Sequence, residues 1–399
     1  MSVKLSQGMY DFAASDHRIG NQMTGNISVT DVKVVELRTV EHVGELEPAW
    51  SPGRNMSFDV GGGSFVEIQS DAGITGIGPG MNPMFVEGVK QYLVGKSVFD
   101  IEQHAASLNY YIPNLHYQGI AGVDIALWDI VGKAANLPLY KLWGGGKEKL
   151  VPYASMVRLS TPEERAELAG SLSNDGWQAI KLRLHHETIA EDIRTVEAVK
   201  EAVGSDMTIM ADGNQAQSGG DWQPGIHWNF QRAYETAVEL QDLDVYWLEE
   251  PLNRYDFDGL AELSGKVEIP IAGGENNIGL HEFVQMCERG VYGLLQPESM
   301  VLGGITNLRK VGVLAEAYGK EIVPHHGGGN IGVIAHMHLV ASWRHAPFME
   351  LLHDPPIGAY KNKFSIMSNA PDIDSEGFMP VPQGPGLGVE IDPDLIVSD

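Results

Sequence analysis

The chain has almost no cysteine, few basic residues and no long apolar run. Its single cysteine, Cys287, excludes an internal disulfide and fits a reducing compartment. No stretch approaches the roughly 20 apolar residues that span a bilayer. The first residues lack the charged-then-apolar pattern of a secretory signal. We therefore predict a cytoplasmic protein with no membrane partner.

The shortage of basic residues makes the chain strongly acidic. Its 27 Lys and Arg face 53 Asp and Glu, which gives a formal net charge of −26. Such a surface repels nucleic acid and anionic membranes, so we expect no nucleic-acid partner. If the substrate is itself an anion, the site needs local positive charge from metal ions or from a few placed Lys or Arg residues.

From Val151 onward, short apolar runs alternate with stretches of helical character. Eight such runs follow one another: VPYAS, AIKLRL, TIMAD, VYWLE, IPIAG, GLLQP, EIVPH and FMELL. The first helix between them has a start signal from Thr161 to Glu164, with a cap, a proline and a capping-box glutamate. This alternation predicts a parallel barrel of strands and helices. Pro355 and Pro356 end the regularity, so we expect the barrel to lack its last helix.

The part of the chain before Val151 has a different pattern and predicts a small α+β domain. The first residues are polar and patternless, which suggests an arm. Two strand-like runs, FVEIQS and ITGIG, flank Asp71-Ala72-Gly73 and predict a hairpin. Helical signals then extend from Glu87 to about Leu142. The predicted divisions are an arm at 1–26, an α+β domain at 27–147, a barrel at 148–355 and a C-terminal segment at 356–399.

Polar residues stand where the predicted barrel strands end, which is where such barrels carry their active sites. They are Lys181, Arg183, His185, Asp212, Asn214, Glu249, Glu250, Glu275, Glu298, His325, His326 and Glu350. Residues at i and i+2 of a strand share a face, so Lys181 and Arg183 can point inward together.

Three successive strands end in carboxylates: Asp212, then Glu249 and Glu250, then Glu275. Hard oxygen ligands of this kind suit Mg²⁺, which accepts a few carboxylates and keeps positions open for water or substrate oxygens. Any one of these acids could instead cap the helix that follows its strand. Three in succession, with the Lys/Arg pair and a histidine, indicate one joint Mg²⁺ site.

The sequence resembles the enolase superfamily, in particular its mandelate racemase-like branch of acid-sugar dehydratases and racemases. The similarity runs from about Val32 to about Leu387. Its matching segments are FVEIQSDAGITGIG, VDIALWDIVGKAANLPLYKLWGG, IKLRL, MADGNQA, WLEEP, IAGGEN, QPESMVLGGIT, VPHH and PFMELL. The resemblance implies an α/β fold, a (β/α)7β modified TIM barrel with an N-terminal α+β capping domain on which the C-terminal segment packs. It also implies a homo-oligomer, a dimer or an octamer.

The resemblance also implies roles for individual residues. The Mg²⁺ ligands would be Asp212 in MADGN, Glu249 as the first glutamate of WLEEP, and Glu275 in GGEN. Their neighbours Asn214 and Glu250 become candidates for supporting or substrate contacts.

The same comparison implies the catalytic groups. His325 in VPHH matches the catalytic histidine, and Glu350 matches a carboxyl group that assists at the substrate carboxylate. The acid that orients the histidine is usually Asp in QPD, whereas this chain has Glu298 in QPE. Glutamate is one methylene longer, so we expect a small shift in its contact with the histidine.

A second departure lies on the second barrel strand. Many relatives carry Lys-x-Lys there, with the second lysine acting as a base, but this chain has Lys181-Leu182-Arg183. A guanidinium, with a pKa above about 12, rarely accepts a proton. We therefore expect Arg183 to hold a carboxylate or an enolate oxygen as a fixed cation, together with Lys181.

Three functions stay open at this point. The first is Mg²⁺-dependent dehydration of a sugar acid to a 2-keto-3-deoxy acid, by removal of the proton α to the carboxylate through an ene-diolate. The second is racemisation or epimerisation of a 2-hydroxy or amino acid, which needs a second base that Arg183 is poorly suited to supply. The third is a non-catalytic metal-binding scaffold.

The small carboxylate substrate itself is not specified. In this family, loops of the first domain close over the barrel and select the substrate. Here they would include GELEPAWSPGRN, with Trp50 and Arg54, and NLHYQG, with His116. His185 could also reach the barrel mouth beside Arg183.

Overall fold

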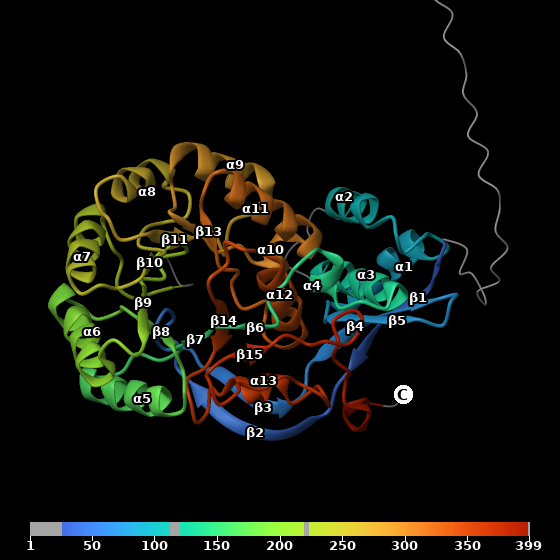
Figure 1. Ribbon diagram of the computed structural model, residues 1–399, viewed down its shortest axis with the longest axis horizontal. Coiled ribbons are helices and arrows are strands. Elements are labelled where there is room, and N and C mark those ends of the chain that lie inside the picture. Colours follow the sequence, from blue (N-terminus) through green and yellow to red (C-terminus); the bar gives the residue numbers. More distant parts are fainter. Residues whose placement is uncertain (1–25, 112–119, 219–222, 398–399) are drawn as a thin grey trace, which may run out of the picture.

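The structure is a computed structural model, and it describes residues 26–111, 120–218 and 223–397 (Figure 1). The predicted arm 1–26 therefore lies almost wholly outside the described residues, as does His116. No helix in the described ranges is long and apolar enough to cross a membrane.

The second part of the chain forms an eight-stranded parallel sheet in the order β13-β12-β11-β10-β9-β8-β7-β14. Its strands are β7 (Pro152–Ser155), β8 (Ala179–Arg183), β9 (Thr208–Asp212), β10 (Leu248–Glu249), β11 (Ile271–Gly273), β12 (Leu294–Leu295), β13 (Glu321–Ile322) and β14 (Met349–Leu352). The last strand pairs with the first, with Glu350 opposite Tyr153. All eight runs of the sequence pattern contribute a strand, and the (β/α)7β modified TIM barrel is confirmed.

Helices connect successive strands on the outside of the sheet (Figure 1). They are α5 (Pro162–Asn174), α6 (Ile189–Val203), α7 (Phe230–Asp242), α8 (Phe257–Ser264), α9 (Leu280–Arg289), α10 (Ser299–Leu302), α11 (Ile305–Ala317) and α12 (Asn330–Ser342). Capping boxes at Thr161 and Thr188 begin α5 and α6, and Thr161 is the start signal seen in the sequence. After β14 only the short helix α13 (Tyr360–Phe364) follows, in agreement with the predicted loss of the eighth helix.

The strands place one apolar layer below one polar layer inside the barrel. The apolar layer is a buried cluster of Tyr153, Ala179, Met210, Trp247, Ala272, Leu294, Val323 and Phe348. Because side chains on one face of a strand recur every two residues, the next inward positions lie two residues further on. Those positions are Ser155, Lys181, Asp212, Glu249, Gly274, Gln296, His325 and Glu350. Strand periodicity thus brings most of the candidate catalytic groups to one level of the barrel mouth.

The N-terminal part forms a three-stranded antiparallel sheet packed against helices. The strands are β1 (Val29–Glu36), β4 (Ser64–Ser70) and β5 (Thr75–Pro79), and the helical elements are η1 (Pro83–Phe85), α1 (Val86–Leu93), α2 (Ile101–Tyr111), α3 (Ile120–Ala135) and α4 (Leu139–Leu142). A Cβ on Gly78 would lie 2.0 Å from the carbonyl oxygen of Gly122, so glycine lets α3 lie directly on β5. The β4–β5 hairpin turns at Asp71-Ala72-Gly73, as predicted.

A second antiparallel pair, β2 (Thr39–Leu46) and β3 (Met56–Gly61), leads into the loop 47–55. The sequence pattern placed residues 44–46 in that loop, but they continue β2 because they pair with Met56, Ser57 and Phe58. Towards the C-terminus, β15 (Met379–Pro380) pairs with β6 (Lys149–Leu150), and η2 (Pro393–Leu395) follows.

The C-terminal segment contacts the N-terminal sheet through backbone hydrogen bonds. Arg38 N donates to Leu395 O at 2.7 Å, and Val397 N donates to Glu36 O at 3.0 Å. These contacts support the division at 27–147, 148–355 and 356–399, which stays a prediction.

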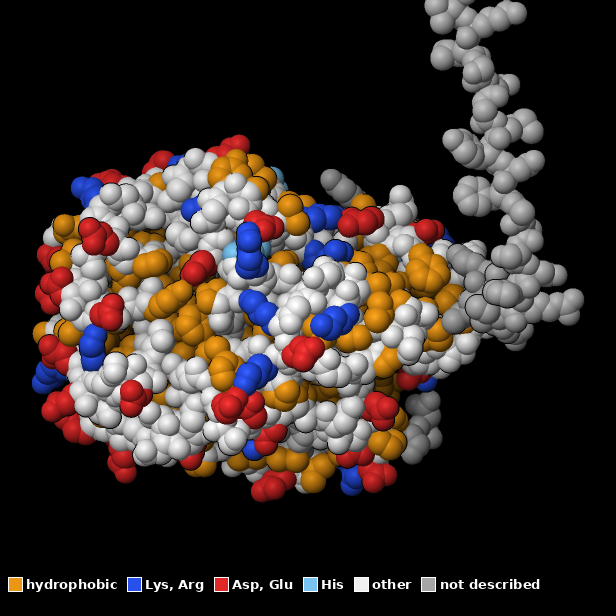
Figure 2. Space-filling model, in the orientation of Figure 1, with side chains coloured by type: hydrophobic (Ala, Val, Ile, Leu, Met, Phe, Trp, Pro, Cys, Tyr) orange, Lys and Arg blue, Asp and Glu red, His pale blue; other side chains and the backbone are white. Residues whose placement is uncertain are grey.

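Figure 2 shows acidic side chains spread along the outline of one face, with Lys and Arg gathered nearer its middle.

Asp354 joins the last barrel strand to the first where the eighth helix is missing. Its buried carboxylate accepts hydrogen bonds from Val157 N at 3.0 Å and Arg158 N at 2.9 Å, and it lies 3.5 Å from the buried guanidinium of Arg165. Burial alone would raise the pKa of Asp354, but Arg165 and the backbone donors hold it below its ordinary value. The ionised carboxylate therefore stabilises the fold at neutral pH, and this contribution is lost as the pH falls through that lowered pKa.

We expect Asp354→Ala to lower the free energy of unfolding by about 3 to 5 kcal/mol, because it leaves a buried guanidinium without its partner. Urea unfolding at neutral pH measures the change, and exposed Asp206→Ala is the matched control. Equal stability of the two variants would show that the junction between the last and the first barrel strand does not depend on this ion pair.

Candidate active site

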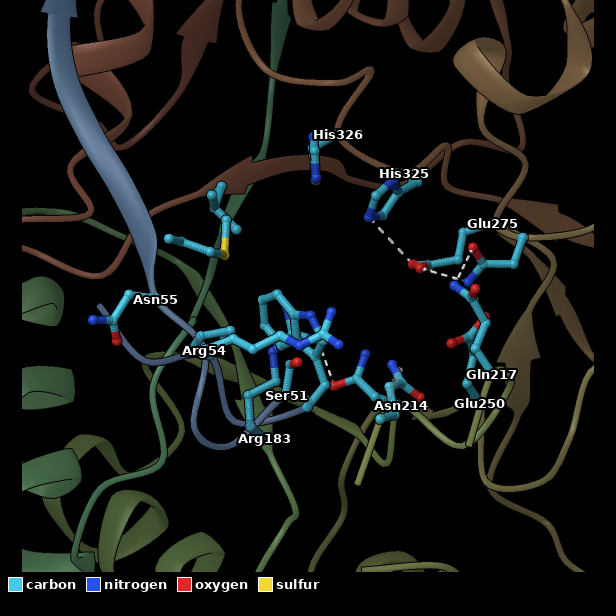
Figure 3. A pocket seen from close by; sticks show the side chains of 16 residues that line it. Ser51, Arg54, Asn55, Arg183, Asn214, Gln217, Glu250, Glu275, His325 and His326 are labelled. Carbon is cyan, nitrogen blue, oxygen red and sulfur yellow. Dashed lines mark hydrogen bonds and ion pairs between the residues drawn. The ribbon is translucent and has the colours of Figure 1, made fainter. Parts of the chain in front are cut away.

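A cavity of about 320 Å³ opens where the barrel strands end, and the loop 47–55 forms part of its wall (Figure 3). It is lined by Pro48, Trp50, Ser51, Arg54, Asn55, Met56, Arg183, Asn214, Gln217, Gln223, Glu250, Glu275, Asn276, His325, His326 and Leu352. Trp50, Arg54, Arg183, Asn214, Glu275 and His325 were predicted site residues. The predicted residues Lys181, Asp212, Glu249, Glu298 and Glu350 are buried behind this lining.

Lys181 is the centre of the buried charge network. Its Nζ lies 2.8 and 2.9 Å from the two oxygens of Glu249, 2.9 Å from Glu350 Oε1 and 3.5 Å from Asp212 Oδ2. Burial would lower the pKa of Lys181, but these carboxylates raise it above its ordinary value. The same ammonium outweighs burial at Glu350 and holds the pKa of that carboxyl below its usual range. Lys181 is therefore a fixed cation.

All three nitrogens of the Arg183 guanidinium donate hydrogen bonds. Nε donates to Met156 O at 2.7 Å, Nη2 donates to Ser155 Oγ at 3.2 Å, and Nη1 donates to Asp212 and, at 3.1 Å, to Asn214 Oδ1. Its Cζ lies 4.7 Å from the centre of the Trp50 ring, which places the cap loop on the barrel cation. In this arrangement Arg183 acts as a donor to neighbouring groups, and its expected lack of a role as a base stays a prediction.

Asn214 connects Arg183 to the predicted metal ligand Asp212. Its backbone N and its Nδ2 donate to Asp212 at 2.7 and 3.0 Å. Its Oδ1 also accepts from His185 Nε2 at 3.0 Å. His185 itself lines a neighbouring cavity beside Arg158 and Glu45, and burial lowers its pKa to about 4. His185 therefore supports Asn214 from outside the main cavity.

Glu249 lies next to Asp212 on the adjacent strand, and the two residues are paired in register. Its Oε2 accepts from Trp247 Nε1 at 3.1 Å and from Gln296 Nε2 at 2.7 Å. Burial, with the nearby charge of Asp212, raises the pKa of Glu249 to about 7. Burial and the charges of Glu275 and Asp212 likewise raise the pKa of Glu250 well above its usual value.

The donor types of these acids suit a divalent cation. The predicted ligands Asp212, Glu249 and Glu275 are oxygen donors at or just beyond the ends of three neighbouring strands, which is the donor set that Mg²⁺ prefers. With Glu250 and Glu350, five carboxylates meet at this end of the barrel, and the permanent cations between them are Lys181 and Arg183. Burial is the main cause of the raised pKa values of Glu249, Glu250 and Glu275, and repulsion among the acids adds to it; a divalent cation would offset that repulsion.

His325 forms a dyad with Glu298, as predicted. Its Nδ1 lies 2.8 Å from Glu298 Oε2, and the same oxygen accepts from Gly327 N at 2.9 Å. Glu298 Oε1 accepts from Met300 N at 2.9 Å. The glutamate side chain, one methylene longer than Asp, thus still reaches His325 and two backbone N–H groups. Burial would raise the pKa of Glu298, but His325 and the other nearby histidines hold it below its usual range. Because an ionised carboxylate only accepts, Nδ1 donates its proton to Glu298, and Nε2 is the nitrogen left to exchange a proton.

Nε2 of His325 points towards Glu275, 3.2 Å from its Oε2 (Figure 3). Burial would lower the pKa of His325, but Glu275, Glu350 and Glu298 raise it to about 10. His336 fixes the position of this segment, because its ring contacts His325 O and, at 2.8 Å, Ser299 Oγ. The arrangement can take a proton at Nε2 and hold the resulting imidazolium between acids.

Several lining residues were not predicted from the sequence. Asn276 donates to Glu275 at 3.0 Å and to Glu250 at 3.3 Å, and Gln217 donates to Asn276 at 2.6 Å. The sequence held a signal for both, because Asn276 is the last residue of GGEN and Gln217 stands three residues after Asn214 of MADGN. Gln296, which holds Glu249, stands two residues before Glu298 and was detectable from strand periodicity alone.

Comparison with protein-family models finds two matches that together cover most of the chain. Residues 163–395 match the model described as enolase C-terminal domain-like. Residues 59–144 match the model of the mandelate racemase and muconate lactonizing enzyme N-terminal domain.

Named proteins with related sequences and structures agree with these matches. Arabinonate dehydratase of Saccharolobus solfataricus is 30% identical over 295 residues, which cover 73% of this chain and 74% of that protein. The 3,6-anhydro-D-galactonate cycloisomerase from Zobellia galactanivorans superposes with a TM-score of 0.75 at 26% identity, over 93% of this chain and 100% of that one. A racemase from Streptomyces coelicolor A3(2) with bound magnesium superposes with a TM-score of 0.74 at 26% identity, over 92% and 100%.

Proposed function

This chain belongs to the mandelate racemase-like branch of the enolase superfamily, and from that premise we propose that it dehydrates a sugar acid to a 2-keto-3-deoxy acid. It is an enzyme of the hydro-lyase class, with Mg²⁺ as its cofactor. The observation that carries the proposed reaction is the His325–Glu298 dyad, whose Nε2 lies at the cavity, 3.2 Å from Glu275 Oε2.

Asp212, Glu249 and Glu275 are the residues proposed to hold Mg²⁺. When bound, the ion polarises the substrate carboxylate, which acidifies the α-proton, and offsets the charge of Glu275 beside His325. Trp247 and Gln296 hold Glu249, and Asn214 and Arg183 hold Asp212, so both carboxylates are oriented before any ligand arrives.

His325 is the proposed general base. Nδ1–H stays bound to Glu298, and Nε2 removes the proton α to the substrate carboxylate. Lys181 supplies positive charge for the ene-diolate oxygens, and Glu350 assists at the carboxylate. The imidazolium then returns its proton to the departing β-hydroxyl as water leaves, and the enol product becomes the 2-keto acid. One histidine serves both steps if the proton and the hydroxyl lie on the same face.

Epimerisation is the second candidate, because a structural relative is named a racemase. It needs a base on the face opposite His325. Among the described residues, the basic side chains lining the cavity are Arg54, Arg183, His325 and His326. Arg183 is committed to four hydrogen-bonding partners as a donor, which favours the one-base reaction.

Incubation of the Mg²⁺-loaded enzyme with a set of acid sugars tests the proposal. We expect a 2-keto acid, detected with semicarbazide, and one solvent-derived hydrogen in the product. Inversion with solvent deuterium uptake and no loss of water would support the epimerase. Absence of both reactions, together with absence of Mg²⁺ affinity, would support the scaffold.

The cap loop is expected to control which sugar acid reacts. Trp50 stacks on Arg183, and Arg54 lines the cavity, so both lie where the distal part of a substrate would rest. Arg54→Met and Trp50→Phe should each change ratios of kcat/KM between acid sugars by about tenfold, the effect of roughly 1.4 kcal/mol. Exposed Arg344→Met is the control. An unchanged substrate profile would contradict the loop assignment.

A further inference from the structure

A second group of metal-ligating side chains lies at the edge of the cavity beside the predicted Mg²⁺ ligands, with His325 Nε2 3.2 Å from Glu275 Oε2. Glu298, His325 and His326 each offer one ligand atom, and these atoms all lie within 4.8 Å of one another. Glu298 is buried, and the two histidines are partly buried. The group therefore combines two imidazoles and one carboxylate in a protected position.

His326 is the member of this group that the proposed dehydration does not use. It lines the cavity, and its ring centre lies 4.0 Å from that of His325. Its Nδ1 is buried and has no hydrogen-bond partner among the described residues. A buried nitrogen without a partner is costly, and a metal ion is one of the partners that an imidazole accepts.

The donor atoms distinguish this group from the acid cluster. Two imidazole nitrogens and one carboxylate oxygen are ligands typical of Zn²⁺, whereas Mg²⁺ prefers oxygen alone. Glu298 stands where the QPD motif of the family has Asp. Its side chain is one methylene longer, and its Oε2 lies within hydrogen-bond distance of both His325 Nδ1 and Gly327 N. The same acid is thus within reach of the position that a metal between the two histidines would occupy.

We propose that Glu298, His325 and His326 bind a Zn²⁺ ion that inhibits the enzyme reversibly. His325 Nδ1 lies 2.8 Å from Glu298 Oε2, so a metal ion on that nitrogen takes the place of the N–H that faces the orienting acid. The neutral imidazole bound through Nδ1 then carries its one ring proton on Nε2. An Nε2–H cannot accept the substrate proton, so the general base is lost. The binding half of the proposal is independent of the proposed function, and the inhibition half rests on it.

Binding is tested in Mg²⁺-saturated protein with Co²⁺ as a spectroscopic substitute for Zn²⁺. We expect one Co²⁺ per chain, with the intense visible absorption of a low-coordinate nitrogen and oxygen site, and displacement by Zn²⁺. His326→Asn should weaken binding at least about 100-fold, since even outer-shell changes cost 10- to 100-fold. Exposed His227→Asn is the matched control and should leave the affinity unchanged.

Two further variants separate this group from the acid cluster. Glu298→Asp should also weaken Co²⁺ binding, which keeps the test decisive if His326→Asn is unstable. Asp212→Asn lies outside the group and should retain Co²⁺ binding. Loss of Co²⁺ binding in Asp212→Asn together with retention in His326→Asn would overturn the proposal, because the metal would then occupy the acid cluster.

Activity separates the inhibition half from the binding half. In the Mg²⁺-saturated enzyme, Zn²⁺ should abolish turnover at one equivalent, excess Mg²⁺ should not restore it, and a Zn²⁺ chelator should. If Co²⁺ or Zn²⁺ binds and the enzyme keeps full turnover, the inhibition half of the proposal is refuted and the binding half stands. If no substrate is turned over at all, the proposed function fails while the spectroscopic result still decides the metal site.

Discussion

His325→Asn is expected to abolish dehydration and also the exchange of the substrate α-proton with solvent deuterium. Removal of a positioned general base costs about 10² to 10⁴ in rate, and more where no other group substitutes. Asparagine fills part of the imidazole volume and can still donate to Glu298, but it offers no basic nitrogen at the position of Nε2. Product analysis and mass spectrometry of recovered substrate in deuterium oxide measure both losses.

The matched control is His227→Asn, which makes the same change at an exposed histidine. Equal thermal unfolding of the two variants would show that the loss is chemical. Robust deuterium exchange that persists in His325→Asn would defeat the one-base mechanism. It would require a second base on the opposite wall and would make epimerisation the preferred function.

The sequence was sufficient for the barrel and for the level of the site, because both follow from short-range patterns. A period of two along each strand puts Lys181, Asp212, Glu249, His325 and Glu350 two residues beyond an inward apolar side chain. The alternation of strands with helices then requires a parallel barrel, whose active end is always the end where strands finish. No long-range information is needed for either step.

The partners of each group could not be read in the same way, because they depend on side chains from distant segments. Lys181 is shared among three acids from three other strands, and Trp50 reaches Arg183 across about a third of the chain. Neither contact leaves a spacing pattern in the sequence. The extension of β2 through Leu46 was missed for a similar reason, since pairing with β3 overrides the effect of Gly44.

Glu249→Gln is expected to remove Mg²⁺ affinity and at least about 10² of kcat/KM. The substitution keeps volume, and its carbonyl oxygen can still accept from Trp247 and Gln296. However, the new amide cannot supply anionic charge, and its N–H groups would face the ammonium of Lys181. A bound metal ion contributes several kcal/mol of transition-state stabilisation, which corresponds to this loss of rate.

Glu250→Gln is the informative comparison, because the two glutamates are adjacent and the WLEEP motif alone allows either to be the ligand. Glu250 has a pKa raised well above its usual value by burial and by Glu275, so an amide resembles its protonated state. We therefore expect Glu250→Gln to weaken Mg²⁺ binding less than Glu249→Gln, with exposed Glu262→Gln unchanged. Calorimetric titration with Mg²⁺ measures all three variants without turnover. The reverse order would move the ligand to Glu250, and since backbone φ is 45° there, the metal would then be held by a strained turn instead of by a strand end.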